Sequence, residues 1–256
     1  MPSKSTPLGR VRRGSALPVQ ASAAALGATP GFIYLASQSP RRRQLLEQLG
    51  VAYELLLPTD DEDAEALEAV LPGEAPARYV KRVTRLKLEA AVARLERRSL
   101  PLAPVLCSDT TVARGQQIFG KPLDDRDAAR MLGALSGATH RVLTAVALWT
   151  PASPLPHPGK ALPAPFRVRA PFFAVPGPAG RGIDTVCESR VTFERMSPAQ
   201  IARYVASGEP RGKAGAYAIQ GQAAMHVTGI QGSYSGIMGL PMHETAVLLR
   251  RVGLLP

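Results

Sequence analysis

The sequence lacks the features that would place it in a membrane, in a disulfide-rich class or around a zinc ion. No apolar run in its 256 residues approaches the roughly 18 residues that a transmembrane helix needs. Its 2 cysteines, Cys107 and Cys187, form no CxxC pair, so we expect reduced thiols in a cytoplasmic protein. The 4 histidines show no metal-ligand spacing, which argues against zinc.

Acidic residues are missing from two stretches that together carry most of the net charge of +11. Residues 1–30 hold four lysines and arginines, residues 151–183 hold another four, and both are rich in proline, glycine, alanine or serine. We predict a disordered basic tail at 1–30, with a weak targeting signal as the alternative. The second stretch is typical of a proline-rich insertion, which leaves residues 31–256 as a single domain.

Strand and helix patterns alternate along the rest of the chain. Apolar runs and apolar–polar alternation predict strands at 32–37, 104–113, 140–149 and 188–196. Apolar stripes with capping residues and terminal glycines predict helices at 40–49, 77–97, 124–137, 197–208 and 241–253. This alternation predicts an α/β layer architecture.

The helix expected at 40–49 begins against a local rule. Ser39 suits the N-cap and Pro40 the first helical position, but Arg41, Arg42 and Arg43 fill the first turn. Cations there face the positive end of the helix dipole, at a cost of about 0.3–1 kcal/mol each when exposed. Such local violations cluster at functional sites.

A bound anion would offset this repulsion. Free N–H groups at a strand-to-helix turn already favour an anion. Ser37 and Ser39 could add hydroxyl donors, and Arg41 and Arg42 could add forked guanidinium groups that suit phosphate. The segment therefore predicts a phosphate site made by these four residues, with a solvated basic face as the alternative.

Three further residues stand where a phosphate site could use them. Asp109 ends the apolar run 105–107 of its strand, and ligands of open α/β sheets gather at the carboxyl ends of strands. The alternative is a buried aspartate that caps the next turn. Lys87 borders the apolar stripe of its helix, so it reaches either a cleft or along the surface. Lys121, in a Gly-Lys-Pro turn, is either a ligand or simply solvated.

Glu62 lies in the acidic run "TDDEDAE", a composition that is usually a solvated loop. Carboxylates together with phosphate oxygens would nevertheless suit Mg²⁺ or Mn²⁺, hard cations that need no histidine or cysteine. No residue in the set is an evident covalent nucleophile. Attack of water on a polyphosphate is therefore the natural reaction for these residues.

Four motifs in the same order resemble a known family. They are "LASQSPRRRQLLEQLG", "SDTTV", "FGKPLDDRDAARMLGALSGATHRVLTAVAL" and "SGEPRGKAGAYAIQGQAAMHVTGIQGSYSGIMGLPMHETAVLL". Together they resemble the Maf family of nucleoside triphosphate pyrophosphatases, also called septum-formation inhibitors, over residues 32–253. The resemblance implies an α/β fold like that of inosine triphosphatases, with a mixed twisted sheet flanked by helices and a nucleotide cleft between two lobes. It also implies hydrolysis between the α- and β-phosphates, with a divalent cation.

The resemblance assigns roles to residues of this chain. Asp109 matches the family's proton-accepting aspartate, which would activate water or help hold the metal. The positions around the triphosphate and metal correspond to Ser37, Arg42, Glu62, Lys87 and Lys121, with Glu62 on the metal. The positions that separate the family's branches are Arg41, Thr110 and Gln220. This set resembles the branch that prefers dTTP and UTP, and modified pyrimidine nucleotides are a further option, whereas the branch acting on 7-methyl-GTP has Trp, Gln and Glu there.

Two other classes of function compete with the enzyme hypothesis. The basic segments could bind nucleic acid, but such binding would be salt-sensitive and sequence-blind, and neither segment has the repeated aromatics of a single-strand platform. A cell-division regulator that acts by contact is the second rival. We therefore expect a cytoplasmic enzyme with a nucleoside triphosphate substrate and no stable nucleic acid or membrane partner; a homodimer is left open.

Overall fold

The computed structural model describes residues 31–59, 62, 66–152 and 170–255. Its strands are β1 (Ile33–Leu35), β2 (Tyr53–Leu55), β3 (Val105–Arg114), β4 (Gln117–Phe119), β5 (Thr139–Pro151), β6 (Phe172–Phe173), β7 (Gly180–Phe193) and β8 (Val227–Gln231). Its α-helices are α1 (Pro40–Gln48), α2 (Pro76–Arg97), α3 (Asp125–Leu135), α4 (Pro198–Ala206), α5 (Tyr234–Met238) and α6 (Met242–Arg251). Short 3₁₀ helices are η1 (Ala66–Glu68), η2 (Ala214–Ala216) and η3 (Gln222–His226). No helix in this described part is long and apolar enough to cross a membrane.

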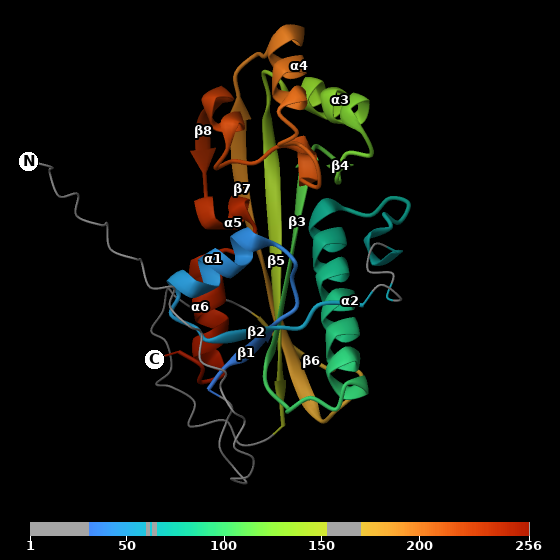
Figure 1. The fold of residues 1–256 in the computed structure, drawn as a ribbon, viewed down its shortest axis with the longest axis vertical. Coiled ribbons are helices and arrows are strands. Elements are labelled where there is room, and N and C mark those ends of the chain that lie inside the picture. Colours follow the sequence, from blue (N-terminus) through green and yellow to red (C-terminus); the bar gives the residue numbers. More distant parts are fainter. Residues whose placement is uncertain (1–30, 60–61, 63–65, 153–169, 256) are drawn as a thin grey trace, which may run out of the picture.

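The strands form one mixed sheet around the long strands β3, β5 and β7 (Figure 1). Their order is β2-β1-β3-β5-β7-β6, with β4 also pairing with β3 and β8 with β7. Strand β1 is parallel to β2 and β3, whereas the other pairings are antiparallel. The predicted α/β fold with a mixed, helix-flanked sheet is confirmed.

Helices cover both faces of the sheet at the end that carries β1 and β2 (Figure 1). On one face, Leu88 of α2 packs in a core with Cys107 of β3. On the other face, Leu46 of α1 and Leu248 of α6 pack in a core with Leu106. Cys107 and Leu106 reach different cores because successive side chains of a strand point to opposite faces.

A separate core lies at the opposite end of the long strands. Leu132 of α3 and Tyr204 of α4 join Val112, Phe119 and Phe193 in this core. Helices α3 and α4 lie together over this end of the sheet (Figure 1). The molecule therefore has two lobes, which share the central strands.

Local signals set several helix ends as predicted. Helix α2 has nearly the bounds that its apolar stripe indicates. Asp124 caps α3 by accepting a backbone hydrogen bond from its first turn. Helix α4, predicted at 197–208, begins with a capping box formed by Ser197 and Gln200. Ser39 occupies the N-cap position of α1, but its side chain makes no capping hydrogen bond.

One edge of β3 is open at its middle. Strand β1 pairs with β3 only at Val105 and Leu106, and β4 pairs with it only from Val112 onward. Among the described residues, no strand pairs with 107–111 on that side, while β5 pairs along the other edge. Asp109 lies at the centre of this open edge.

Strand β3 continues past Asp109, although its apolar run ends at residue 107. Asp109 pairs with Ala145 of β5, and β3 continues to Arg114. In the half of β3 that follows Asp109, the backbone forms antiparallel hydrogen bonds with β5, so polar side chains do not end the strand. The strand that ends beside Asp109 is β1, whose last residue, Leu35, pairs with Leu106. The carboxyl end that matters here is therefore that of β1.

The basic segments are described only in part. Residues 1–30, the predicted tail, lie outside the described residues, as do residues 153–169. Within the predicted insertion at 151–183, strand β6 and the first residues of β7 pair in the sheet. Residues 172–173 and 180–183 of this stretch therefore belong to the sheet.

Candidate active site

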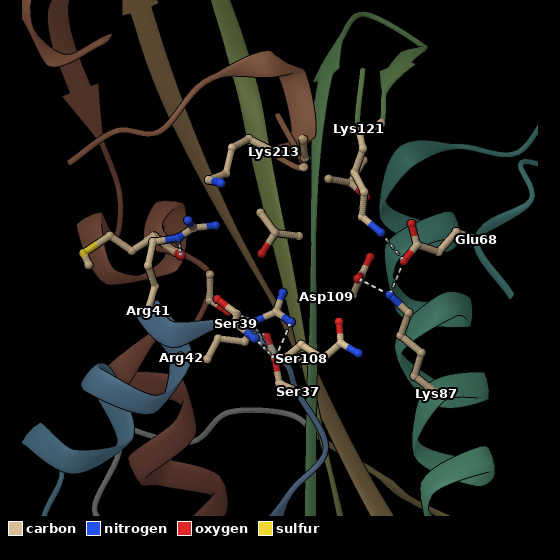
Figure 2. Close-up of a pocket in the computed structure, with 18 of the residues that line it drawn as sticks. Ser37, Ser39, Arg41, Arg42, Glu68, Lys87, Ser108, Asp109, Lys121 and Lys213 are labelled. Atoms are coloured by element: carbon tan, nitrogen blue, oxygen red, sulfur yellow. Dashed lines mark hydrogen bonds and ion pairs between the residues drawn. The ribbon is translucent and has the colours of Figure 1, made fainter. Parts of the chain in front are cut away.

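A cavity of about 910 Å³ lies over the open edge of β3 (Figure 2). Every candidate residue from the sequence lines it: Ser37, Ser39, Arg41, Arg42, Glu62, Lys87, Asp109, Thr110, Lys121 and Gln220. Neighbouring side chains of β3 point to opposite faces of the sheet. A cavity at this free edge can therefore be lined from both faces at once.

Arg41 and Arg42 line one side of the cavity, the arginine wall. Arg42 donates from Nε to the carbonyl oxygen of Gly239 at 2.8 Å and from Nη1 to Oγ of Ser37 at 3.1 Å. Arg41 donates from Nε to the carbonyl oxygen of Met238 at 3.3 Å. Both carbonyls stand at the C-terminal end of α5, where cations are favoured. The cations that oppose the dipole of α1 are thus compensated by α5.

Burial affects the charge of the arginine wall. Burial lowers the pKa of Arg41. It also lowers the pKa of Arg42, because it outweighs the nearby Asp109 carboxylate, which raises that pKa. Both remain cations, because arginine ionises far above neutral pH. A guanidinium has five N–H donors, so bonding to α5 leaves each arginine able to bind phosphate oxygens. A desolvated cation gains strongly from an anionic ligand.

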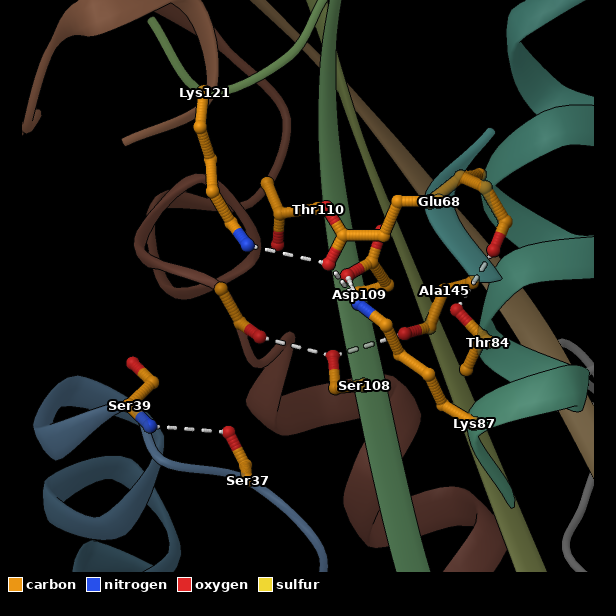
Figure 3. A network of polar contacts seen from close by, with 12 residues as sticks. Ser37, Ser39, Glu68, Thr84, Lys87, Ser108, Asp109, Thr110, Lys121 and Ala145 are labelled. Atoms are coloured by element: carbon orange, nitrogen blue, oxygen red, sulfur yellow. Dashed lines mark hydrogen bonds and ion pairs between the residues drawn. The ribbon is translucent and has the colours of Figure 1, made fainter. Parts of the chain in front are cut away.

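Lys87, Lys121, Asp109 and Glu68 form the opposite side, the lysine wall (Figure 3). Nζ of Lys87 lies 2.6 Å from Oδ1 of Asp109 and 2.7 Å from Oε1 of Glu68. Nζ of Lys121 lies 3.3 Å from the same Oε1. Lys87 extends from α2, Asp109 from β3 and Glu68 from η1. Lys87 therefore reaches the cleft instead of the outer surface.

Opposite charges in the lysine wall shift the pKa of Lys87 and of Glu68. Burial by itself would lower the pKa of Lys87, but the Asp109 and Glu68 carboxylates outweigh it and raise the pKa. Burial would raise the pKa of Glu68, but the ammonium groups of Lys87 and Lys121 lower it. Lys87 and the Glu68 carboxylate are thus ionised at neutral pH.

Glu62 lines the cavity but faces a different partner. Its carboxylate accepts hydrogen bonds from Nε of Arg94 at 2.9 Å and 3.0 Å, and it pairs with Arg97. The hydrogen bond from Arg94 is the largest effect on its pKa, which falls to about 2. Glu68, not Glu62, is thus the glutamate beside Asp109. Arg94 engages both oxygens of the Glu62 carboxylate in this structure, and the metal role of Glu62 stays a prediction.

Thr110 and Gln220, the other proposed branch-determining residues, lie on the α5 side and at the rim. Oγ1 of Thr110 is 2.9 Å from Oγ1 of Thr144, which donates to the carbonyl oxygen of Gly236 at 2.7 Å. Because the hydroxyl of Thr144 donates its hydrogen to Gly236, the hydroxyl of Thr110 donates to Thr144 and offers lone pairs to the cavity. Gln220 is exposed and lines the cavity.

Three charged residues of the cavity were missed by the sequence analysis: Glu68, Arg94 and Lys213. Glu68 lies in "EALEAV", which has no signal of a site. Lys213 precedes η2 and extends into the cavity on the side of Arg41 (Figure 2). Burial and the charge of Arg41 lower its pKa. Its motif, "GKAGAY", was recognised, and a lysine before a glycine-containing turn could have indicated Lys213.

The thiols do not supply a nucleophile to this cavity. Cys107 and Cys187 are buried and unpaired. Burial is the main cause that raises the pKa of each thiol to about 12, so neither is a thiolate at neutral pH. Cations on two walls with a carboxylate at the strand edge are instead suited to hold a polyphosphate beside a base.

Comparison with known proteins decides the family. A family model described as Maf-like protein matches residues 32–252, which span almost the whole described part of the chain. The chain belongs to the Maf family. The match includes both walls of the cavity, so the site is part of the Maf domain.

Named Maf relatives cover nearly the same region. A protein of Albidiferax ferrireducens named dTTP/UTP pyrophosphatase is 62% identical over 222 residues, which are 87% of this chain and 97% of the relative. A protein of Polaromonas sp. with the same name is 58% identical over 87% of this chain and 96% of its own. A third, of Cupriavidus pinatubonensis, is 56% identical over 87% and 98%.

Proposed function

We propose that this Maf protein hydrolyses dTTP and UTP between the α- and β-phosphates, releasing a nucleoside monophosphate and pyrophosphate. The observation that carries the proposal is the placement of Asp109 on an open strand edge, in a cavity that the arginine wall lines on one side and Lys87 and Lys121 line on the other. The name dTTP/UTP pyrophosphatase, shared by relatives that are 56–62% identical, supports the choice of nucleotides.

Each wall has a task in this reaction. Arg41 and Arg42 bind and orient phosphate oxygens from one face of the sheet, and Lys87 and Lys121 do so from the other. Fixed cations of this kind stabilise the charge that develops on the phosphates. Asp109 accepts a proton from the attacking water, and Lys87, 2.6 Å away, holds the carboxylate in position. The water oxygen forms a bond to the α-phosphorus while the bond from that phosphorus to the bridging oxygen breaks and pyrophosphate leaves, so no covalent intermediate on the protein is needed.

The nucleoside end of the substrate would lie near Thr110, Gln220 and Arg41. Thr110 offers lone pairs and Gln220 offers an amide with both donors and an acceptor. A pyrimidine edge with carbonyl and N–H groups can pair with such an amide. This assignment rests on the resemblance to the dTTP/UTP branch and on the position of these residues in the cavity.

The resemblance implies a divalent cation, and the carboxylates of the cavity are the groups that could hold it. Within the described residues, no group of three or more His, Cys, Asp or Glu side chains is arranged so that it could hold a metal ion by itself. The two carboxylates of the lysine wall, Asp109 and Glu68, both contact Lys87. Mg²⁺ is often held by one or two carboxylates plus substrate phosphates, so the donors fit a cation that arrives with the triphosphate. Asp109 would hold it, and it would neutralise phosphate charge.

The deciding experiment resolves the products. The purified protein is incubated with dTTP, UTP, GTP and 7-methyl-GTP, each with Mg²⁺, with Mn²⁺ and with EDTA. We expect monophosphate plus pyrophosphate from dTTP and UTP, with little turnover of the purine nucleotides. Orthophosphate plus diphosphate would overturn the cleavage site, and full activity in EDTA would overturn the role of the cation.

A further inference from the structure

We propose that Glu68 competes with phosphate for the two lysines of the site. Its carboxylate holds Lys87 and Lys121 in the free protein and takes them back when pyrophosphate leaves. The choice of pyrophosphate as the displaced ligand rests on the proposed function. The contacts themselves do not depend on it.

Glu68 takes the place that a phosphate oxygen would take. A single oxygen, Oε1, accepts from Nζ of Lys87 at 2.7 Å and from Nζ of Lys121 at 3.3 Å (Figure 3). These ammonium groups reach it from different elements, α2 and the turn after β4. One anionic oxygen bridging two cations is also how lysines bind a phosphate group. The carboxylate is only 25% exposed, so the pair is partly desolvated.

The main chain around Glu68 is fixed to α2 by contacts that do not use its carboxylate. The hydroxyl of Tyr79 donates to the carbonyl oxygen of Glu68 at 2.9 Å. Nη2 of Arg82 donates to the carbonyl oxygen of Ala69 at 2.8 Å, and Arg82 also binds Glu74 with two nitrogens. The backbone therefore holds Glu68 beside the lysines, while the side chain can rotate away.

Charge explains why such a residue would be useful. The two lysines together with Arg41 and Arg42 would hold pyrophosphate, a polyanion, strongly. Since Lys87 already pairs with Asp109 at 2.6 Å, Glu68 adds a second negative charge to the same ammonium. A carboxylate in this position weakens the binding of any phosphate and lowers the cost of product release.

Glu68 could instead be a metal ligand. The two roles predict opposite effects of the Glu68 carboxylate on pyrophosphate binding. A ligand of a substrate-borne cation would strengthen the binding of magnesium pyrophosphate. A competitor weakens the binding of pyrophosphate, with or without magnesium. The contacts favour competition, because both described partners of the Glu68 carboxylate are ammonium groups.

The test is isothermal titration of the full chain with inorganic pyrophosphate, in EDTA and in Mg²⁺. Glu68→Gln keeps the shape and removes the charge, and Glu68→Ala removes the carboxylate by truncation. We expect both variants to bind pyrophosphate about tenfold more tightly than the wild type, which corresponds to about 1.4 kcal/mol. Glu68→Asp, which keeps the charge, should stay within about threefold of the wild type.

The matched control is Glu96→Gln, an exposed glutamate on the same helix that carries Lys87. It removes the same charge away from the cavity and should leave pyrophosphate affinity unchanged. Unchanged or weaker binding by Glu68→Gln and Glu68→Ala, in either arm, would overturn the proposal. Hydrolysis of dTTP is followed in parallel. Its absence in the wild type would overturn the proposed function, while the titrations would still decide the role of Glu68.

Discussion

Arg42 donates a hydrogen bond from Nε to the carbonyl oxygen of Gly239 at 2.8 Å, joining the first turn of α1 to the end of α5. Gly239 has a left-handed φ of 118°, which turns the chain as α5 ends. A cation at this helix end is favourable, although the same cation is unfavourable at the start of α1. Arg42 therefore has a structural partner in the free protein as well as a proposed ligand.

Replacing Arg42 should weaken both stability and substrate binding. Arg42→Gln removes the hydrogen bonds to Gly239 and Ser37 and should lower the free energy of unfolding by about 1.5–3 kcal/mol. It should also raise the KM for dTTP, because one guanidinium of the arginine wall is lost. Denaturant unfolding and steady-state kinetics measure the two effects. Arg43→Gln, in the same turn but outside the cavity lining, is the matched control and should change neither quantity strongly.

Asp109→Asn should keep the fold and remove most of the turnover. The amide cannot accept the proton from water, and general base catalysis contributes about 10²–10⁴-fold. Glu68 continues to pair with Lys87 in this variant, so the melting temperature should change little. An unaltered kcat, with product identity confirmed, would mean that Asp109 only positions Lys87.

Lys213→Met should act on binding more than on chemistry. Lys213 extends into the cavity beside Arg41 and is a cation that the sequence analysis missed. Losing one charge-assisted hydrogen bond of about 1.5–3 kcal/mol should raise the KM for dTTP by at least about tenfold. The nearby Arg211→Gln is the control, because Arg211 is exposed and pairs with Asp125 outside the cavity. Equal KM values for both variants would remove Lys213 from the site.

The fold could be predicted well where its signals are local. Capping residues, terminal glycines and apolar stripes placed α2, α3 and α4 because each signal acts within a few residues. The open edge of β3 could not be predicted, since it depends on β1 ending at Leu35 and on β4 pairing only from Val112. For the same reason Asp109 was assigned to the carboxyl end of its own apolar run, whereas the strand that ends beside it is β1.

The site was predictable to the extent that its residues stand in motifs. Glu68 was missed because its position depends on Tyr79 and Arg82, which bind its segment to α2 from farther along the chain. For Glu62, the acidic run does not show that its carboxylate meets a buried arginine. Only the packing of Arg94, which is 4% exposed, decides that.

Glu62→Gln tests this difference. Removing the carboxylate leaves the buried Arg94 guanidinium without its anion, and breaking a buried pair costs about 3–5 kcal/mol. Glu62 is 17% exposed, so the low end of that range is expected. The variant should therefore melt earlier, yet need the same Mg²⁺ concentration for half-maximal activity. A normal melting temperature with a raised magnesium requirement would instead support the metal role predicted for Glu62.

His140 should make the stability of the protein depend on pH. The ring is buried, with Nε2 2.8 Å from the hydroxyl of Tyr217 and an edge contact to Phe193. Burial, the largest cause, lowers the pKa of His140 from 6.5 to about 4. Between these values the unfolded chain binds a proton that the folded protein does not. Stability is therefore lost as the pH falls from 6.5 towards 4, by up to about 1.4 kcal/mol per pH unit.

The measurement is the free energy of unfolding at several pH values between 7.5 and 4. His140→Gln can still hydrogen-bond to Tyr217 but loses the ring contact to Phe193, so it should be less stable than the wild type at pH 7.5. Because its side chain does not titrate, it should lose less stability on acidification. The exposed His243→Gln is the matched control and should keep the wild-type slope. Parallel curves for the wild type and His140→Gln would show that His140 is protonated in the fold, because only a histidine that stays neutral on folding produces the difference in slope.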